Sequence, residues 1–241
     1  MIPKIIHYCW FGHGQMPKLE LKCIESWKKY LPDYHIKLWN EDNFDLSLNE
    51  YVSEAYQARK FAFVTDYVRL FVLYNEGGIY MDTDVEVLKS LDDFLTLPAF
   101  SGFEGEGYVP TGIMASEKNG HWVKEQLNYY MGRHFILSDG TFDITTNTQI
   151  ISGIMASNGF VLKNSYQIYK NYVHIFPYDY FSPLKYGKII LTENSHCIHH
   201  FASSWNPGKR KFKKFFYNKI LGGSITYLLV KLKRRLFRLP F

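Results

Sequence analysis

The chain has 241 residues, enough for one large domain or for one domain with appendages. Hydrophobic residues make up 46% of it, which is ample for a packed core, yet no apolar run is long enough to form a membrane-spanning helix. The three cysteines, Cys9, Cys23 and Cys197, are widely spaced and form no metal-binding or disulfide pattern. This pattern favours a reducing cytosol.

The net charge of +5 conceals an uneven distribution along the chain. Residues 207–241 contain 11 Lys and Arg and no Asp or Glu, which leaves 17 basic and 23 acidic residues, a net charge of −6, for residues 1–206. The two parts therefore need separate explanations. We divide the chain into a domain of residues 1–206 and a basic amphipathic tail of residues 207–241.

The N-terminal part of the sequence predicts a strand–helix–strand unit. Residues 2–8 predict a buried strand that ends in an aromatic and glycine-rich loop at residues 9–14. Residues 17–31 predict a helix, and the alternating residues 34–39 predict a second strand. Two strands joined through a helix begin a parallel sheet, whose ligands bind at the carboxyl ends of the strands. Trp10, in the first loop, either stacks on a nucleobase or plugs the core.

The next segment predicts two helices, over residues 50–57 and 60–75. The second is largely apolar and leads directly into a short apolar strand. Within it, Asp66 and Arg69 lie on adjacent positions of one face. They form either a surface salt bridge of little energetic value or a pair that is used in a site.

Asp82-Thr83-Asp84 follows the short apolar strand. Side chains alternate between the two faces of a strand, so we expect the carboxylates of Asp82 and Asp84 to point the same way. Two like charges on one face repel each other unless a cation or hydrogen-bond donors lie between them. The motif therefore predicts an oxygen-ligand site for Mn²⁺ or Mg²⁺ that is shared with a phosphate. The alternative is a solvated turn.

The second half of the domain predicts further strands and helices and ends in two adjacent histidines. His199 and His200 lie on the last predicted strand and therefore face opposite ways, and we favour His200 as the one that points at the site. His7, in the first strand, is expected to be a hydrogen-bonded structural residue. The strands are expected at residues 99–104, 108–115, 172–176 and 197–201, and the helices at residues 120–131 and 149–157.

Four segments, taken in order, resemble glycosyltransferase family 32, whose members carry an Asp-x-Asp motif. This family includes bacterial capsular and lipopolysaccharide enzymes and initiating mannosyltransferases of yeasts, and it is distantly similar to clostridial glucosylating toxins. The resemblance is clear over residues 2–115 and 196–206. The chain departs from the family pattern at Thr111-Gly112, where the family usually carries an asparagine. The four segments are residues 5–12, 62–69, 77–84 and 199–205.

This resemblance implies a GT-A fold, in which a mixed, mainly parallel sheet flanked by helices binds the nucleotide. It also implies retention of anomeric configuration. Trp10 would stack on the base, and Asp66 and Arg69 would hold the donor sugar and its phosphate side. Asp82 would contact the ribose and the sugar. The full set implied to bind the nucleotide-sugar is Trp10, Asp66, Arg69, Tyr80, Asp82, Ser204 and Trp205.

The resemblance also implies a metal shell and a closing loop. Asp84 would bind the ion directly and Asp82 through water, with His200 as a further candidate ligand. Ser204 and Trp205 would close over the diphosphate, and Ser204 is an alternative ligand. Asn147 and Gln149 are expected on the acceptor side. The residues expected to carry catalysis are Asp66, Arg69, Asp82, Asp84 and Trp205.

We therefore expect a retaining, metal-dependent hexosyltransferase that uses Mn²⁺ or Mg²⁺ and acts in the synthesis of cell-surface polysaccharide. UDP-hexose is the favoured donor, and a glycan or lipid-linked glycan is the expected acceptor. One alternative is a GDP-mannose-dependent mannosyltransferase. Another is a non-catalytic protein that binds sugar nucleotides or glycans.

Residues 209–241 interleave Lys and Arg with aromatic and aliphatic residues. This composition favours a peripheral helix on an anionic membrane leaflet. Nucleic acid is the rival partner, which we reject because the acidic domain would repel a phosphate backbone. A terminal helix that packs on the domain is the remaining alternative. We expect a cytoplasmic protein that associates with the inner face of the membrane.

Overall fold

The computed structural model describes residues 1–104, 107–185 and 188–202. Ser204, Trp205 and the whole of the tail at residues 207–241 lie outside this described part. The roles predicted for them stay predictions. Among the described residues, none of the helices has both the length and the apolar character needed to cross a bilayer.

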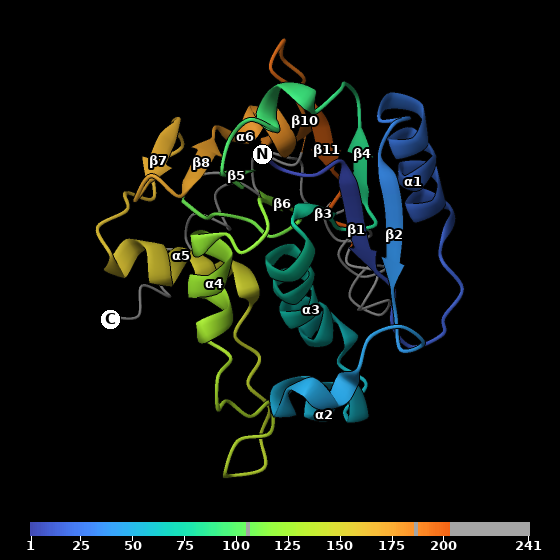
Figure 1. The fold of residues 1–241 in the computed structure, drawn as a ribbon, viewed down its shortest axis with the longest axis vertical. Helices are drawn as coiled ribbons and strands as arrows, with labels where there is room; N and C mark the ends of the chain where they lie inside the picture. The colour runs from blue at the N-terminus through green and yellow to red at the C-terminus, as the bar shows by residue number, and fades with distance from the viewer. Residues whose placement is uncertain (105–106, 186–187, 203–241) are drawn as a thin grey trace, which may run out of the picture.

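A seven-stranded sheet forms the centre of the fold (Figure 1). Five of its strands, β1, β2, β3, β5 and β8, run in one direction, whereas β6 and β7 run antiparallel to their neighbours. The predicted α/β class with a mixed, mainly parallel sheet is therefore confirmed. In spatial order the strands are β2 (His35–Trp39), β1 (Ile5–Cys9), β3 (Gly78–Met81), β6 (Ile113–Ser116), β5 (Ala99–Gly102), β8 (Val173–Phe176) and β7 (Gln167–Tyr169).

Helices flank this sheet on both faces, because alternate strand residues point to opposite sides. In β3, Tyr80 packs into the core beneath α2, α3, α4 and α5, whereas Ile79 and Met81 pack into a second core with α1 and β4. The helices are α1 (Lys18–Tyr30), α2 (Glu50–Gln57), α3 (Phe61–Glu76), α4 (His121–Asn128), α5 (Asn147–Ser157) and α6 (Tyr178–Phe181), with short 3₁₀ turns at Leu46–Leu48 and Asp92–Phe94.

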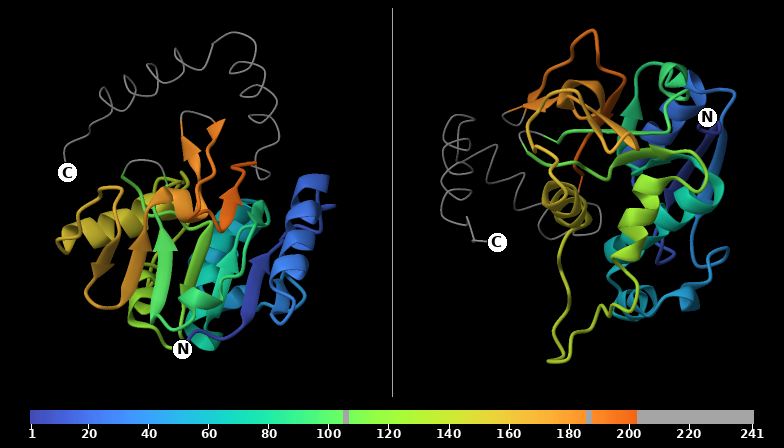
Figure 2. Two further views of the ribbon diagram at one scale, coloured as in Figure 1. Left: turned by 90° about the horizontal axis from the view of Figure 1, so that it is seen from above. Right: turned by 60° about the vertical axis from the view of Figure 1, so that its left-hand side comes forward.

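Two small antiparallel sheets stand beside the central one. Strand β4 (Val85–Val87) pairs with β11 (Cys197–His199), and β9 (Leu184–Lys185) pairs with β10 (Lys188–Ile189). The loop that joins α4 to α5 projects from the body in Figure 1 and in the right-hand view of Figure 2. The pairing of β4 with β11 brings the C-terminal end of the described chain next to the Asp-x-Asp motif.

His7 fixes the junction between β1 and β3. Its Nδ1 accepts a hydrogen bond from Trp39 Nε1 at 3.1 Å, so its Nε2 donates to Gly77 O at 2.8 Å. A Cβ on Gly78, whose φ is +107°, would lie 2.7 Å from Ile5 O. The strand that leads to the two aspartates is therefore packed tightly against β1, and the prediction that His7 is a structural residue is confirmed.

The predicted strand at residues 108–115 is too long at its N-terminal end. The structure has strand only from Ile113 to Ser116. Pro110 has no N–H to donate to a sheet, which explains why the preceding segment runs outside the ladder. Strand β7 was not predicted, since its three residues are too few to show a period.

Candidate active site

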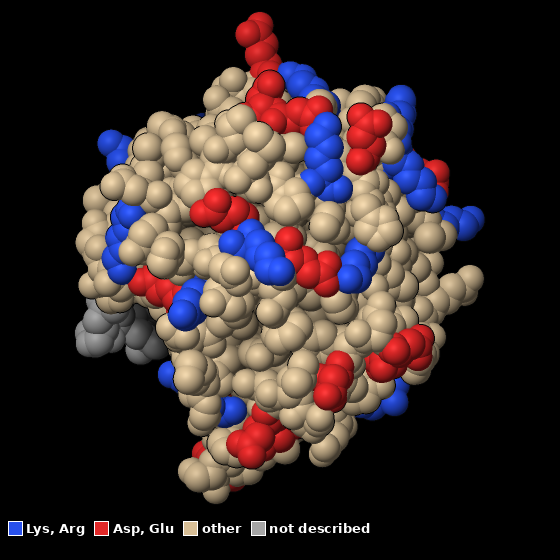
Figure 3. Space-filling model, in the orientation of Figure 1, with Lys and Arg blue, Asp and Glu red and all other residues tan. Residues whose placement is uncertain are grey.

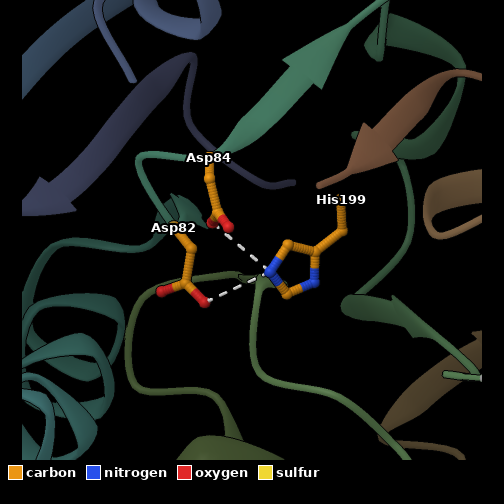
Figure 4. Close-up of side chains that lie close together, drawn as sticks. All are labelled: Asp82, Asp84 and His199. Atoms are coloured by element: carbon orange, nitrogen blue, oxygen red, sulfur yellow. Dashed lines mark ion pairs between the residues drawn. The ribbon is translucent and has the colours of Figure 1, made fainter. Parts of the chain in front are cut away.

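The Asp-x-Asp motif forms a turn and not the end of a strand. Strand β3 ends at Met81, and Val85 N donates to Asp82 O at 3.0 Å across the turn. The expected strand alternation is therefore wrong as a reason for the two carboxylates to lie together. The two carboxylates nevertheless converge, since each lies beside the same imidazole nitrogen, Nε2 of His199 (Figure 4). Asp82 Oδ2 is 3.9 Å and Asp84 Oδ1 is 3.4 Å from His199 Nε2.

The histidine at this site is His199, so the prediction that favoured His200 is wrong for this structure. His199 pairs with Val85 across the β4–β11 ladder, which carries its ring over the turn. His200, the next residue, faces the other way, and its Nε2 lies 2.8 Å from Glu86 Oε2. The expectation that the two neighbours face opposite ways is confirmed. Which of them faces the aspartates depends on a strand pairing that the sequence does not reveal.

Two further contacts fix the position of Asp84. Its Oδ2 accepts a hydrogen bond from Ala202 N at 2.6 Å, and its backbone oxygen accepts one from His200 N at 3.0 Å. Burial raises the pKa of Asp84, but the contacts with His199 and Ala202 outweigh this effect and hold the pKa below its ordinary value of 3.8. Asp84 is therefore an ionised, buried carboxylate that joins β4 to the segment after β11.

Gly112 leaves room for the imidazole. A Cβ at this position would lie 2.6 Å from His199 Cε1, and Gly112 O accepts a hydrogen bond from Asp82 N at 2.8 Å. The neighbouring Thr111 O accepts from Arg69 Nη1 at 2.6 Å. The Thr111-Gly112 pair, which departs from the family pattern, thus supports the site through its backbone. Sequence reasoning missed this role, because an isolated glycine gives no sign of which ring lies against it.

Arg69 joins the two acidic parts of the site. Its Nη2 lies 3.1 Å from Asp66 Oδ1, and its Nη1 lies 3.2 Å from Asp82 Oδ1. The guanidinium stacks 4.5 Å from the ring centroid of Tyr80, whose hydroxyl donates to Asp82 Oδ1 at 2.9 Å. The Arg69 side chain is 6% exposed and that of Asp66 is 12% exposed. This is a buried ion-pair network and not the surface salt bridge considered as an alternative.

Asp66 has an unusual electrostatic environment for an acid. Burial raises its pKa to about 7. Arg69 lowers the pKa but does not outweigh burial, since that cation is shared with Asp82, whose own charge raises the pKa of Asp66. Its folded-state pKa therefore lies above the ordinary value of 3.8. A buried, strongly perturbed acid beside a cation is typical of a functional site.

The two residues expected on the acceptor side differ in their surroundings. Asn147, at the start of α5, is buried, its Nδ2 donates to Asp66 O at 3.4 Å, and its Oδ1 has no partner among the described residues. Gln149 is exposed, and its Oε1 accepts from Thr146 N at 3.2 Å in the cap of the same helix. The structure thus brings Asn147, but not the Gln149 side chain, to the buried ion-pair network. Their acceptor-side roles stay predictions.

The cluster of Asp82, Asp84 and His199 fits a divalent cation. Each residue offers one ligand atom, and the three atoms lie within 4.8 Å of one another. Carboxylate oxygens with one imidazole suit Mn²⁺, whereas Mg²⁺ prefers an all-oxygen shell. Burial lowers the pKa of His199, but Asp84 and Asp82 outweigh it and raise the pKa above 6.5, so a bound cation would replace a proton there. Over residues 1–104, 107–185 and 188–202, no other such trio comes this close together.

Comparison with known proteins agrees with this geometry. Residues 17–100 match the family described as "Glycosyltransferase sugar-binding region containing DXD motif". The fold is similar to that of the solved PaToxG glycosyltransferase, with a TM-score of 0.50 and 20% identity over 66% of this chain and 69% of that one. The predicted resemblance is therefore confirmed for the segment that carries the Asp-x-Asp motif, and the predicted GT-A-type fold agrees with that of a solved glycosyltransferase.

Two relatives are similar to different extents of the chain. An inositol phosphoceramide mannosyltransferase of Schizosaccharomyces pombe is 31% identical over 128 residues, which are 50% of this chain and 34% of that protein. An uncharacterized glycosyltransferase of Acanthamoeba polyphaga mimivirus is 25% identical over 92% of this chain and 90% of its own length. The chain thus spans about a third of the mannosyltransferase and most of the viral protein.

Proposed function

We propose that this protein is a retaining, metal-dependent hexosyltransferase that takes its sugar from a nucleoside diphosphate. The observation that carries the proposal is the convergence of Asp82, Asp84 and His199 beside the buried Asp66–Arg69 pair. Mn²⁺ is the favoured ion. A cation held by this trio would supply Lewis-acid stabilisation of the leaving diphosphate.

The protein's own residues would divide the remaining work. Arg69 presents a planar donor that its buried contacts hold in place, and it lies within reach of both Asp66 and Asp82. Asp66 can accept hydrogen bonds from two hydroxyls of the donor sugar. This discriminates between epimers, because a buried acceptor that loses its partner is costly. Trp10 would stack on the base, and Ser204 and Trp205 would exclude water from the reacting carbon.

The donor and the acceptor are the finer parts of the proposal. UDP-hexose remains the first candidate donor, as the resemblance favours. GDP-mannose is the second, because several relatives are named mannosyltransferases. Those relatives are named for inositol phosphoceramide, which supports a lipid-borne hydroxyl group as the acceptor class. The resemblance of the sequence to glycosyltransferase family 32 supports a role in capsule or lipopolysaccharide synthesis.

A screen of sugar nucleotides with and without Mn²⁺ tests this function. At about 100 times its Kd, the true donor is expected to raise Tm by about 5–10 °C, and only when the metal is present. The same donor should then be hydrolysed slowly or transferred to an acceptor, with the anomeric configuration read by NMR. Binding with no turnover on any acceptor would favour the non-catalytic alternative. Stabilisation that is equal in EDTA would contradict the metal role.

We also propose that residues 209–241 hold the protein on an anionic membrane, near a lipid-linked acceptor. On the face of the body drawn in Figure 3, basic and acidic side chains are intermixed, whereas residues 209–241 carry 11 Lys and Arg and no Asp or Glu. The full chain is expected to co-sediment with vesicles that contain phosphatidylglycerol, and a chain of residues 1–208 is expected to stay in the supernatant. Equal sedimentation of the full chain and of the shortened chain would contradict this proposal.

A further inference from the structure

The loops that follow β1 and β2 lie side by side at the carboxyl ends of these strands. The two strands are parallel, with Cys9 opposite Trp39, and Trp10 N donates to Trp39 O at 2.9 Å just beyond the last ladder pair. Two residues further along each loop, Gly12 N donates to Glu41 Oε1 at 2.8 Å. The Glu41 side chain thus belongs to the wall that carries Trp10.

Glu41 uses one carboxylate oxygen and leaves the other free. Besides Gly12 N, its Oε1 accepts a hydrogen bond from Tyr56 at 3.0 Å and lies 3.3 Å from His13 Nε2. The Glu41 side chain is only 8% exposed, and its Oε2 is buried without a hydrogen-bond partner among the described residues. A buried charged oxygen without a partner is costly, so a ligand that donates a hydrogen bond to Oε2 would gain affinity from it.

The other polar side chains of this loop are already occupied. Asn40 Nδ2 donates to Asp42 Oδ2 at 3.1 Å, and Asn43 Nδ2 donates to Leu38 O at 2.8 Å. Burial raises the pKa of Glu41, but hydrogen bonds from its own backbone N–H, Gly12 N and the Tyr56 hydroxyl outweigh this effect and hold the pKa below 4.5, so the side chain remains ionised. The free position is therefore an acceptor only, and it will pair with an N–H or O–H of a ligand and repel a lone pair.

We propose that Glu41 Oε2 accepts the ring imino N–H of the donor's nucleobase and so selects the base. This inference rests on the proposed function. Uracil carries this hydrogen on N3 and guanine carries it on N1, whereas cytosine and adenine present a lone pair at the equivalent ring nitrogen. The side chain of His13 is 66% exposed and its Nε2 lies 3.3 Å from Oε1 of the same carboxylate, so movement of this side chain would open a path to the carboxylate.

The test compares nucleoside diphosphates within each ring size, because the members of a pair differ chiefly at this edge. Binding of UDP and CDP, and of GDP and ADP, is measured by calorimetry with Mn²⁺ and the full chain. The wild-type protein is expected to bind UDP at least about tenfold more tightly than CDP, or GDP at least about tenfold more tightly than ADP. The pair that binds more tightly, pyrimidine or purine, identifies the base of the donor nucleotide.

Glu41→Gln separates base reading from support of the loop. The amide oxygen can still accept from Gly12 N, but the free oxygen becomes an N–H donor, so the preference within the tighter pair should fall to about onefold or reverse. Tyr56→Phe is the matched control, because it removes a donor to the same carboxylate but not the free oxygen. It should weaken both members of each pair by a similar factor and keep their ratio.

Three outcomes overturn the proposal. A wild-type protein that binds CDP as well as UDP and ADP as well as GDP has no imino-reading acceptor. A Glu41→Gln variant that keeps the wild-type ratio shows that Glu41 only supports the loop. If no nucleotide binds to the wild-type protein with Mn²⁺, the base-reading role and the proposed function are both wrong, whereas the first two outcomes leave the proposed function standing.

Discussion

Replacing Asp84 with Asn is expected to lower the rate of sugar transfer by about 100- to 1000-fold at saturating Mn²⁺. Asn keeps the shape of the side chain and can still accept from Ala202 N, but the atom beside His199 Nε2 becomes an uncharged amide nitrogen. An amide N–H does not bind a cation. Initial rates across a Mn²⁺ titration at a fixed donor concentration will measure the loss.

Asp139→Asn is the matched control for the loss of one charge. Asp139 is exposed in the loop between α4 and α5, where its Oδ1 accepts hydrogen bonds from Thr141, so the rate of this variant should stay within about twofold of the wild-type value. If Asp84→Asn kept the wild-type rate and metal response, the assignment of Asp84 as a ligand would be wrong.

Gly112→Ala is expected to disturb the same site through the ring of His199. The new Cβ would meet the His199 ring and push it from the aspartates, so the affinity for Mn²⁺ is expected to fall by about 10- to 100-fold. Gly153→Ala, on α5, adds a Cβ that meets nothing within 4 Å and should leave the affinity unchanged. Equal affinities in the two variants would remove His199 from the metal shell.

Arg69→Met is expected to lower the free energy of unfolding by about 3–5 kcal/mol near neutral pH, because it leaves the buried Asp66 and the nearby Asp82 without their shared cation. Met fills most of the volume of the lost side chain, so the loss reports charge more than packing. Urea unfolding without donor or metal measures it. Arg133→Met, at an exposed arginine that stacks on Tyr129, should change the unfolding free energy by less than about 1 kcal/mol.

The size of the Arg69→Met effect should depend on pH. The folded-state pKa of Asp66, about 7, is above its ordinary value of 3.8. Its contribution to stability is therefore full below about pH 4 and is lost as the pH rises through about 7. Without Arg69 the pKa rises further, so the variant should be more strongly destabilised at pH 8 than at pH 5. Adding Asp66→Asn should recover part of the loss at pH 8. The same loss at both pH values would mean that Asp66 is not its source.

The parts of the fold that follow from local sequence were predicted well. Helix α3 carries Asp66 and Arg69 on one face because its apolar period spans the whole segment. It ends at Glu76, and Gly77 follows as the C-cap with a φ of +71°, which a glycine permits. The parallel pairing of β1 with β2 follows from the helix between them. Here the sequence pattern and the structure depend on the same short-range rules.

The parts that failed depend on contacts between distant segments. The choice of His199 over His200 depends on the register of β11 on β4, and a shift of one residue would exchange them. The convergence of Asp82 and Asp84 depends on a turn and on the ring that lies over it, not on the period of a strand. The free oxygen of Glu41 becomes visible only once Gly12 and Tyr56 are seen to share the other one.

The pairing of β4 with β11 also means that the parts of the candidate site are made at different times during synthesis of the chain. Ala202, whose amide holds Asp84, lies 118 residues after it. A ribosome that adds about 5–20 residues per second needs about 6–24 s to cover that distance. During this time the nascent chain carries two neighbouring aspartates without the imidazole and amide that complete their surroundings. The turn that carries the two aspartates is thus made well before the strand and the amide that complete their surroundings.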